Sequence, residues 1–390
     1  MRELKTIEMH TCGEPARIVI DGMPELRGST MQEKEQDMRE HYDNLRTAII
    51  QEPRGHQNMF GIVLTKPCRP EADFGVLFLN GVGYEGMCGH GTICLATAAV
   101  NEGWIPLTEP ETVMKIDTVT GLVPVRIRVK DGRAQSVTLQ NVPSFVYSTD
   151  QEIHTDHHGT VRADIVFGGN VFALINVDQQ GIPMTLESLR PLTNLAMDVL
   201  AHVNDDASFR HPELPAFRKI EFMLLYSDKD AAPGYSGRNC IIFEGEQTDR
   251  SPCGTGVSAR VADLVHRGRL AIGEETAQDN LMGQRFTGRA VAAEQVGGFP
   301  AVRVEISGTA YKTGSCTFLI DENDPLTYGF PFHASPPWAA RCAARFPPPA
   351  PRVFAAYTPQ KTLCASGGAR TYLFKKGKAL FKRACYIPRR

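Results

Sequence analysis

Two short stretches share one pattern: Cys-Gly-His-Gly-Thr at residues 88–92 and Cys-Gly-Thr-Gly-Val at residues 253–257. Strand-like sequence precedes each stretch. In each case a glycine, Gly103 or Gly268, stands fifteen residues after the cysteine, where it can end a helix. Self-similarity of this kind indicates two structurally related halves. We therefore expect the two Cys-Gly-x-Gly turns to face each other across a cleft.

A cysteine at the start of a helix has chemistry that suits proton transfer. The helix dipole and the free N–H groups of the first turn favour the thiolate, and the same N–H groups can bind a carboxylate. Two such turns would hold an α-amino acid with one sulfur on each face of its Cα. One thiolate would remove the α-proton, the opposite thiol would supply a proton to the other face, and the N–H dipoles would stabilise the enolate-like transition state. This arrangement is typical of a two-base racemase, which needs no cofactor.

The sequence around these turns predicts an α+β chain. Besides the two helices that follow the cysteines, helices are predicted at 31–49, capped by Thr30, and at 186–203. Residues 164–175 read as one strand with a bend at Gly168-Gly169. Alternating or apolar runs predict further strands at 61–65, 74–79, 123–129, 136–139, 220–226, 239–243, 290–296, 301–306 and 316–320.

Charge is divided unequally along the 390 residues, although the formal net charge is only −2. Residues 335–390 hold twelve Lys and Arg and no acidic residue, which leaves 30 basic against 44 acidic residues in positions 1–334. An acidic body argues against a nucleic-acid partner, and no run approaches the ~18 apolar residues of a membrane span. With no apolar leader visible, we expect a cytoplasmic protein. The Pro- and Arg-rich tail, 335–390, is expected to be disordered.

Longer motifs resemble the proline racemase family, which also contains 4-hydroxyproline epimerases and trans-3-hydroxy-L-proline dehydratases. The resemblance covers about residues 5–330, and its motifs lie at residues 10–15, 46–48, 52–56, 87–92, 167–169 and 249–256. It implies a diaminopimelate-epimerase-like fold with two pseudo-symmetric halves, each a β-rich sheet or barrel around a central helix. It also implies a homodimer and catalysis without a cofactor. We expect residues 1–145 with 310–334 to form the half containing Cys88, and 146–309 the half containing Cys253.

The resemblance also implies roles for individual residues, and it implies no metal ligand. Cys88 and Cys253 resemble the two catalytic acid–base residues. Because the family's dehydratases keep only one of the two cysteines, the pair favours racemisation or epimerisation. The expected substrate-binding residues are Gly89, His90, Asp249, Gly254, Thr255, Phe60 and Phe243.

Each assignment has a structural alternative. The two cysteines could be buried structural thiols, His90 could be a capping or solvated side chain, Asp249 could pair with Arg250, and the two phenylalanines could pack in the core. Among functions, the aromatic pair favours proline, because an apolar pocket suits an unsubstituted pyrrolidine ring. 4-Hydroxyproline 2-epimerisation is the second hypothesis. A catalytically silent amino-acid-binding or interaction protein is the third.

Overall fold

The structure is a computed structural model that describes residues 1–215, 217–229, 237–332, 372–376 and 379–383. Its contacts divide the chain into two units, Met1–Ala339 and Ala340–Arg390. Within the second unit the structure describes one antiparallel pair, β19 (Tyr372–Lys376) and β20 (Ala379–Arg383). The remainder of the tail that the sequence predicts to be disordered lies outside the described residues.

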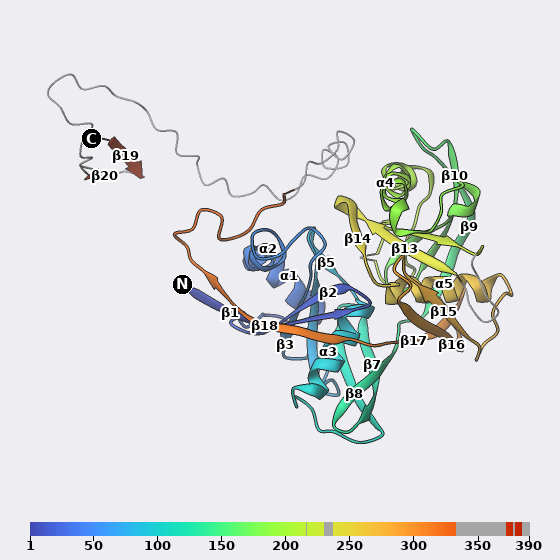
Figure 1. Ribbon diagram of the computed structural model, residues 1–390, viewed down its shortest axis with the longest axis horizontal. Coiled ribbons are helices and arrows are strands. Elements are labelled where there is room, and N and C mark those ends of the chain that lie inside the picture. The colour runs from blue at the N-terminus through green and yellow to red at the C-terminus, as the bar shows by residue number, and fades with distance from the viewer. Residues whose placement is uncertain (216, 230–236, 333–371, 377–378, 384–390) are drawn as a thin grey trace. The chain divides into compact units, whose positions relative to one another are not determined.

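One set of strands in the first unit surrounds helix α3 (Gly89–Asn101), as Figure 1 shows. The helix is buried from Gly89 to Val100, as its apolar composition on every side requires. The ladder runs β18-β1-β2-β3-β4-β6-β7-β8, with the two-residue β5 beside β4. The bounds are β1 (Arg2–Thr11), β2 (Glu14–Asp21), β3 (Phe60–Thr65), β4 (Phe74–Leu79), β5 (Tyr84–Glu85), β6 (Glu111–Thr118), β7 (Gly121–Lys130), β8 (Arg133–Gln140) and β18 (Tyr311–Ile320).

A second set of strands closes on itself around helix α5 (Gly254–His266). The ring runs β9-β10-β11-β12-β13-β15-β16-β17 and returns to β9, while the other end of β17 pairs with β8 and so joins the two sets. Short β14 pairs with β13, and α4 (Leu189–Asp206) packs outside the ring against β9, β12 and β13. The bounds are β9 (Ser144–His154), β10 (Thr160–Phe167), β11 (Val171–Asn176), β12 (Phe222–Ser227), β13 (Arg238–Phe243), β14 (Gln247–Asp249), β15 (Glu275–Asp279), β16 (Arg285–Val296) and β17 (Phe299–Gly308).

The predicted α+β class with two strand-wrapped helices is therefore confirmed. The predicted strands between 61 and 79, 123 and 139, 220 and 243, and 290 and 320 are present. The boundaries of the two halves stay a prediction. Within the described residues, no helix combines the length and apolar composition that crossing a membrane requires.

The single helix predicted at 31–49 is wrong, because the segment forms α1 (Met31–His41) and α2 (Asp43–Ile50). The Thr30 side chain caps α1 as predicted, accepting the Glu33 N–H at 3.1 Å. The break falls at Tyr42, whose φ of −134° is not helical. Contacts distant in sequence hold α2 in its own direction: Arg46 donates to the Asn80 carbonyl at 2.9 Å.

The single bent strand predicted at 164–175 is also wrong. The glycine pair forms a tight turn between antiparallel β10 and β11, in which Phe167 faces Val171. A Cβ on Gly168 would lie 2.3 Å from the Thr255 carbonyl oxygen, so only glycine lets this turn approach the start of α5. The turn therefore positions the second cysteine motif instead of bending one strand.

Candidate active site

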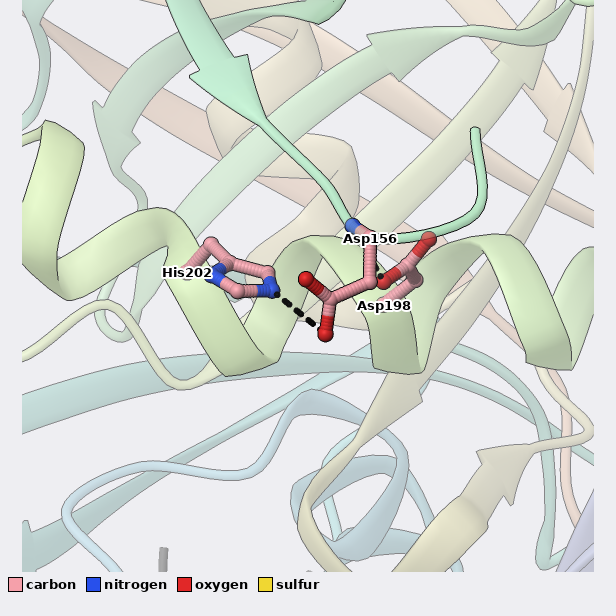
Figure 2. A group of neighbouring side chains, drawn as sticks. All are labelled: Asp156, Asp198 and His202. Atoms are coloured by element: carbon pink, nitrogen blue, oxygen red, sulfur yellow. Dashed lines mark hydrogen bonds and ion pairs between the residues drawn. The ribbon is translucent and has the colours of Figure 1, made fainter. Parts of the chain in front are cut away.

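One polar cluster, on α4 and the β9–β10 loop, has the ligand types of a metal site. Asp156, Asp198 and His202 place their ligand atoms within 4.8 Å of one another (Figure 2). Hydrogen bonds already explain the cluster: the Asp198 carboxylate accepts three, from the backbone N–H groups of Asp156 and His157 and from the His158 ring. We assign it no metal, and the expectation that the protein needs no metal or cofactor stays a prediction.

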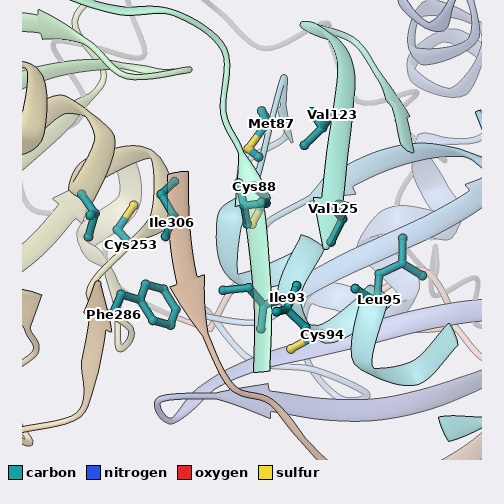
Figure 3. Close-up of a cluster of buried hydrophobic side chains, with 14 of the residues drawn as sticks. Met87, Cys88, Ile93, Cys94, Leu95, Val123, Val125, Cys253, Phe286 and Ile306 are labelled. Carbon is teal, nitrogen blue, oxygen red and sulfur yellow. The ribbon is translucent and has the colours of Figure 1, made fainter. Parts of the chain in front are cut away.

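The two Cys-Gly-x-Gly turns meet at the N-termini of α3 and α5. A Cβ on Gly89 would lie 2.5 Å from the Gly254 Cα, and a Cβ on Gly254 would lie 2.6 Å from the Gly89 Cα. Because any larger residue would collide with backbone, only glycine permits this approach. Cys88 and Cys253 are the N-cap residues of the two helices. Because the helix N-termini meet, both cysteines belong to one cluster of buried residues (Figure 3).

The two thiols line one small cavity. It leaves about 10 Å³ for the centre of a water-sized molecule, which is about the space of one water. An amino acid is larger than this, so its entry must move part of the wall. The cavity is lined by Phe60, Glu85, Cys88, Gly89, His90, Asn170, Phe222, Ile241, Phe243, Asp249, Cys253, Gly254 and Thr255.

All nine residues singled out from the sequence thus line one cavity. Four lining residues were missed: Glu85, Asn170, Phe222 and Ile241. A local signal existed for two of them, because Glu85 lies three residues before the first cysteine and Asn170 follows the glycine pair. Phe222 and Ile241 read as ordinary strand residues, and only the pairing of β12 with β13 brings them to the cavity.

Cys88 lies beside a neutral imidazole. Its sulfur is 3.2 Å from His90 Nδ1, and the His90 ring packs edge-on against Phe60 with 4.5 Å between ring centroids. Burial lowers the pKa of His90, outweighing the charge of Asp249, which raises it. At neutral pH His90 therefore offers a donor and an acceptor without a full positive charge.

Cys253 stands on a strained backbone. Its φ is +63°, a conformation that non-glycine residues seldom adopt and that costs roughly 1–3 kcal/mol. Neighbouring groups hold it there: the Ser251 hydroxyl accepts the Cys253 N–H at 3.0 Å, and Asn239 donates to the Pro252 carbonyl at 2.9 Å. The Cys253 sulfur lies 3.5 Å from the Thr255 hydroxyl. Strain of this kind is concentrated at functional sites.

The sequence predicts that the helix N-termini lower the pKa of both thiols, but the structure gives the opposite net direction. Burial raises the pKa of Cys88 and Cys253 well above the usual value, and the charges of Glu85 and Asp249 raise it further. The backbone N–H groups of Gly91 and Gly256 do favour the thiolates, as the helix argument expects. Desolvation of the buried thiols outweighs them.

The remaining lining consists of an aromatic wall and two carboxyl groups. Phe60 and Phe243 have ring centroids 6.0 Å apart, and Phe222 packs against Phe243 at 5.1 Å. One carboxylate oxygen of Asp249 accepts the Ser251 N–H at 2.8 Å, and Glu85 accepts a bond of 3.0 Å from Asn80. Two thiols, free helix N–H groups, carboxyl groups and an apolar wall together suit a small zwitterion with an apolar ring.

Comparison with known proteins agrees with this geometry. A family model described as proline racemase matches residues 6–331. A proline racemase of Clostridioides difficile is 42% identical over 329 residues, 84% of this chain and 98% of that protein. A 3-hydroxyproline 2-epimerase of Burkholderia multivorans is 39% identical with the same coverage. A solved hydroxyproline epimerase from Agrobacterium vitis, with bound trans-4-OH-L-proline, superposes with a TM-score of 0.79 at 31% identity, covering 85% of this chain and 95% of that one.

Proposed function

The chain belongs to the proline racemase family, and we propose that it interconverts L- and D-proline with Cys88 and Cys253 as the two bases. One observation carries the proposal. The two cysteines cap helices that meet through bare glycine backbone, and both line the same buried cavity. A purely structural or core-packing role does not explain why both thiols line the same cavity beside two carboxyl groups.

The lining offers a partner for each part of the substrate. The substrate carboxylate would lie against the N–H groups at the starts of α3 and α5, near Gly89, His90, Gly254 and Thr255. Asp249 would accept the ammonium group, and the pyrrolidine ring would pack on Phe60 and Phe243. Cα would then lie between the two sulfurs, with its hydrogen directed at one of them.

Racemisation then needs two proton transfers. The thiolate of one cysteine takes the α-proton, an S–H bond forms, and the C–H electron pair delocalises into the substrate carboxylate. The opposite thiol gives its proton to the other face of Cα and becomes a thiolate. A thiol whose pKa is raised by burial gives a stronger base once it is deprotonated. Burial also strengthens the effect of the N–H dipoles that stabilise the developing charge.

The reaction as proposed uses no cofactor and no metal, because the thiols and N–H groups supply the acid, the base and the charge stabilisation. A homodimer is proposed from the family resemblance alone. The cytoplasmic location stays a prediction from the sequence.

A second candidate is 4-hydroxyproline 2-epimerisation. It is supported by the Agrobacterium vitis hydroxyproline epimerase, whose structure holds trans-4-OH-L-proline. The aromatic wall of Phe60, Phe222 and Phe243 favours the unsubstituted ring. A catalytically silent binding protein is disfavoured, because it would not need two cysteines in the cavity.

A polarimetric assay tests the proposal. Reduced enzyme should abolish the optical rotation of L-proline, and kcat/KM for L-proline should exceed kcat/KM for trans-4-hydroxy-L-proline. The reverse ranking would establish the epimerase. An optical rotation that stays unchanged with both substrates would leave the silent binding protein.

A further inference from the structure

Two carboxyl groups in the cavity wall each have an oxygen without a protein partner. Glu85 Oε1 accepts the Asn80 Nδ2–H at 3.0 Å, and one Asp249 oxygen accepts the Ser251 N–H at 2.8 Å. Within the described residues, no hydrogen bond or ion pair reaches Glu85 Oε2 or Asp249 Oδ2. Both residues are buried, at 7% and 6% exposure. Neither oxygen is among the fully buried polar atoms that lack a partner, so each keeps accessible surface from which it can contact a ligand.

Glu85 is held firmly in place. Its backbone pairs with Phe78 of β4. The Asn80 side-chain oxygen accepts the N–H groups of Val82 and Gly83, at 3.0 and 2.7 Å, which fixes the amide so that its Nδ2–H points to Glu85. The free oxygen is therefore preorganised, as an acceptor for a ligand should be.

The cavity lacks a positive charge. Its described lining contains no lysine or arginine, and burial lowers the pKa of His90. Burial, followed by the charges of Asp249 and Glu221, raises the pKa of Glu85 to about 8. An ammonium group placed beside these two carboxyl groups would offset their accumulation, whereas a neutral ring hydroxyl would not.

We propose that Glu85 accepts one N–H of the substrate's secondary ammonium group while Asp249 accepts the other. This inference rests on the proposed function and deepens it. A cyclic imino acid in its zwitterionic form has two N–H donors on nitrogen, and the cavity presents two free carboxyl oxygens. A primary amino acid has three N–H donors and would leave one without a carboxyl partner. Glu85 is thus a substrate-binding residue that selects cyclic imino acids.

The variant Glu85→Gln tests this pairing. Glutamine keeps the shape, but its one oxygen cannot serve Asn80 and the substrate together, and its NH₂ group would face a cation. Since a hydrogen bond to a charged group contributes about 1.5–3 kcal/mol, KM for L-proline should rise by roughly 10–100-fold. Pyrrole-2-carboxylate is a suitable second probe because its ring nitrogen is uncharged and has one N–H. Its Kd should change by less than about threefold.

Glu221→Gln is the matched control. Glu221 is exposed and outside the cavity lining, yet its charge acts on Glu85. If removing any nearby negative charge weakens L-proline binding, both variants will show it; if contact matters, only Glu85→Gln will. Unchanged melting temperatures would confirm that both variants are folded.

The outcomes separate this inference from the proposed function. If the wild type is active and Glu85→Gln keeps the wild-type KM for L-proline, the inference alone is overturned. The same holds if Glu85→Gln weakens the binding of pyrrole-2-carboxylate by as large a factor as the binding of L-proline. An effect confined to trans-4-hydroxy-L-proline would place Glu85 on the ring hydroxyl and also overturn it. If the wild type binds L-proline without racemising it, and Glu85→Gln loses that binding, only the proposed racemisation is overturned. A wild type that does not bind L-proline overturns both.

Discussion

At the scale of single residues, the two thiols are chemically alike but differently surrounded. Cys88 lies beside the His90 ring, while Cys253 lies beside the Thr255 hydroxyl on a strained backbone. Replacing either sulfur by a hydroxyl leaves a much weaker acid and removes the base for one enantiomer. Cys88→Ser and Cys253→Ser should each lower kcat for L-proline by on the order of 10²–10⁴-fold, measured by loss of optical rotation.

The control for these variants is Cys316→Ser, which changes an exposed cysteine on β18. It should keep the wild-type rate. Full activity in either Cys88→Ser or Cys253→Ser would contradict the two-base scheme, because each enantiomer needs both groups in every turnover.

The raised thiol pKa values predict how activity depends on pH. Burial holds both cysteines above their usual pKa, so the thiol form dominates at neutral pH and the thiolate fraction grows as pH rises. Since one cysteine must be a thiolate, kcat/KM for L-proline should increase from pH 7 towards pH 9. A pH–rate profile measures this, and a rate that is flat or higher at pH 6 would show that the thiolate is already formed at neutral pH.

The sequence located much of the site because the important residues lie in short local motifs. A Cys-Gly-x-Gly turn before a helix indicates a thiol, N–H donors and close backbone approach without knowledge of the fold. The motif could not reveal the part of the cavity wall formed by Phe222 and Ile241, since these residues come from strands whose pairing depends on the whole ring of strands. Nor could it weigh desolvation against the helix dipole, and the predicted direction of the thiol pKa shift was therefore wrong.

At the scale of elements, the contact between α3 and α5 decides the geometry. Gly89→Ala would put a methyl carbon 2.5 Å from the Gly254 Cα, and neither backbone can yield without moving a cysteine. Overpacking of this kind should lower the free energy of unfolding by about 1–3 kcal/mol. Displacing the sulfurs by even ~1 Å should reduce kcat/KM by about 100-fold. Urea denaturation and the rotation assay measure the two effects.

Gly314→Ala is the matched control, because a Cβ on this β18 glycine meets nothing within 4 Å. It should change neither stability nor rate appreciably. If Gly89→Ala had the same stability and kcat/KM as Gly314→Ala, the close contact between the N-termini of α3 and α5 would not be required for folding or activity.

Element prediction failed where distant contacts override local pattern. Residues 31–49 have a continuous helical pattern, yet the chain breaks at Tyr42 because Arg46 and Asp43 are held by the segment around Asn80 and Tyr84. Residues 164–175 read as one apolar run, yet the glycine pair reverses the chain because the start of α5 lies against it. The segment around Asn80 and Tyr84, and the start of α5, cannot be identified as neighbours of these stretches before the fold is known.

At the scale of the whole molecule, the unit Met1–Ala339 contains every residue assigned to the reaction, and the family match ends at residue 331. A chain ending at Ala339 should therefore keep kcat/KM for L-proline and the melting temperature of the full chain. It would lose all twelve basic residues of the tail and should bind an anion exchanger more strongly.

The measurement compares both chains at equal concentration and ionic strength. Loss of activity in the shorter chain, with its melting temperature unchanged, would show that residues 340–390 take part in the reaction. A lower melting temperature would show that they stabilise the first unit instead.

The unequal surroundings of the two thiols have a consequence for enantiomer kinetics. Mirror-image substrates have equal free energies in solution, so the equilibrium constant of a racemisation is one. The Haldane relation then forces kcat/KM to be the same for L- and D-proline, whatever His90 and Thr255 do to their neighbouring sulfurs. The asymmetry can appear only as a matched difference in kcat and KM taken separately. For a hydroxyproline the two forms are diastereomers, and that constraint no longer holds.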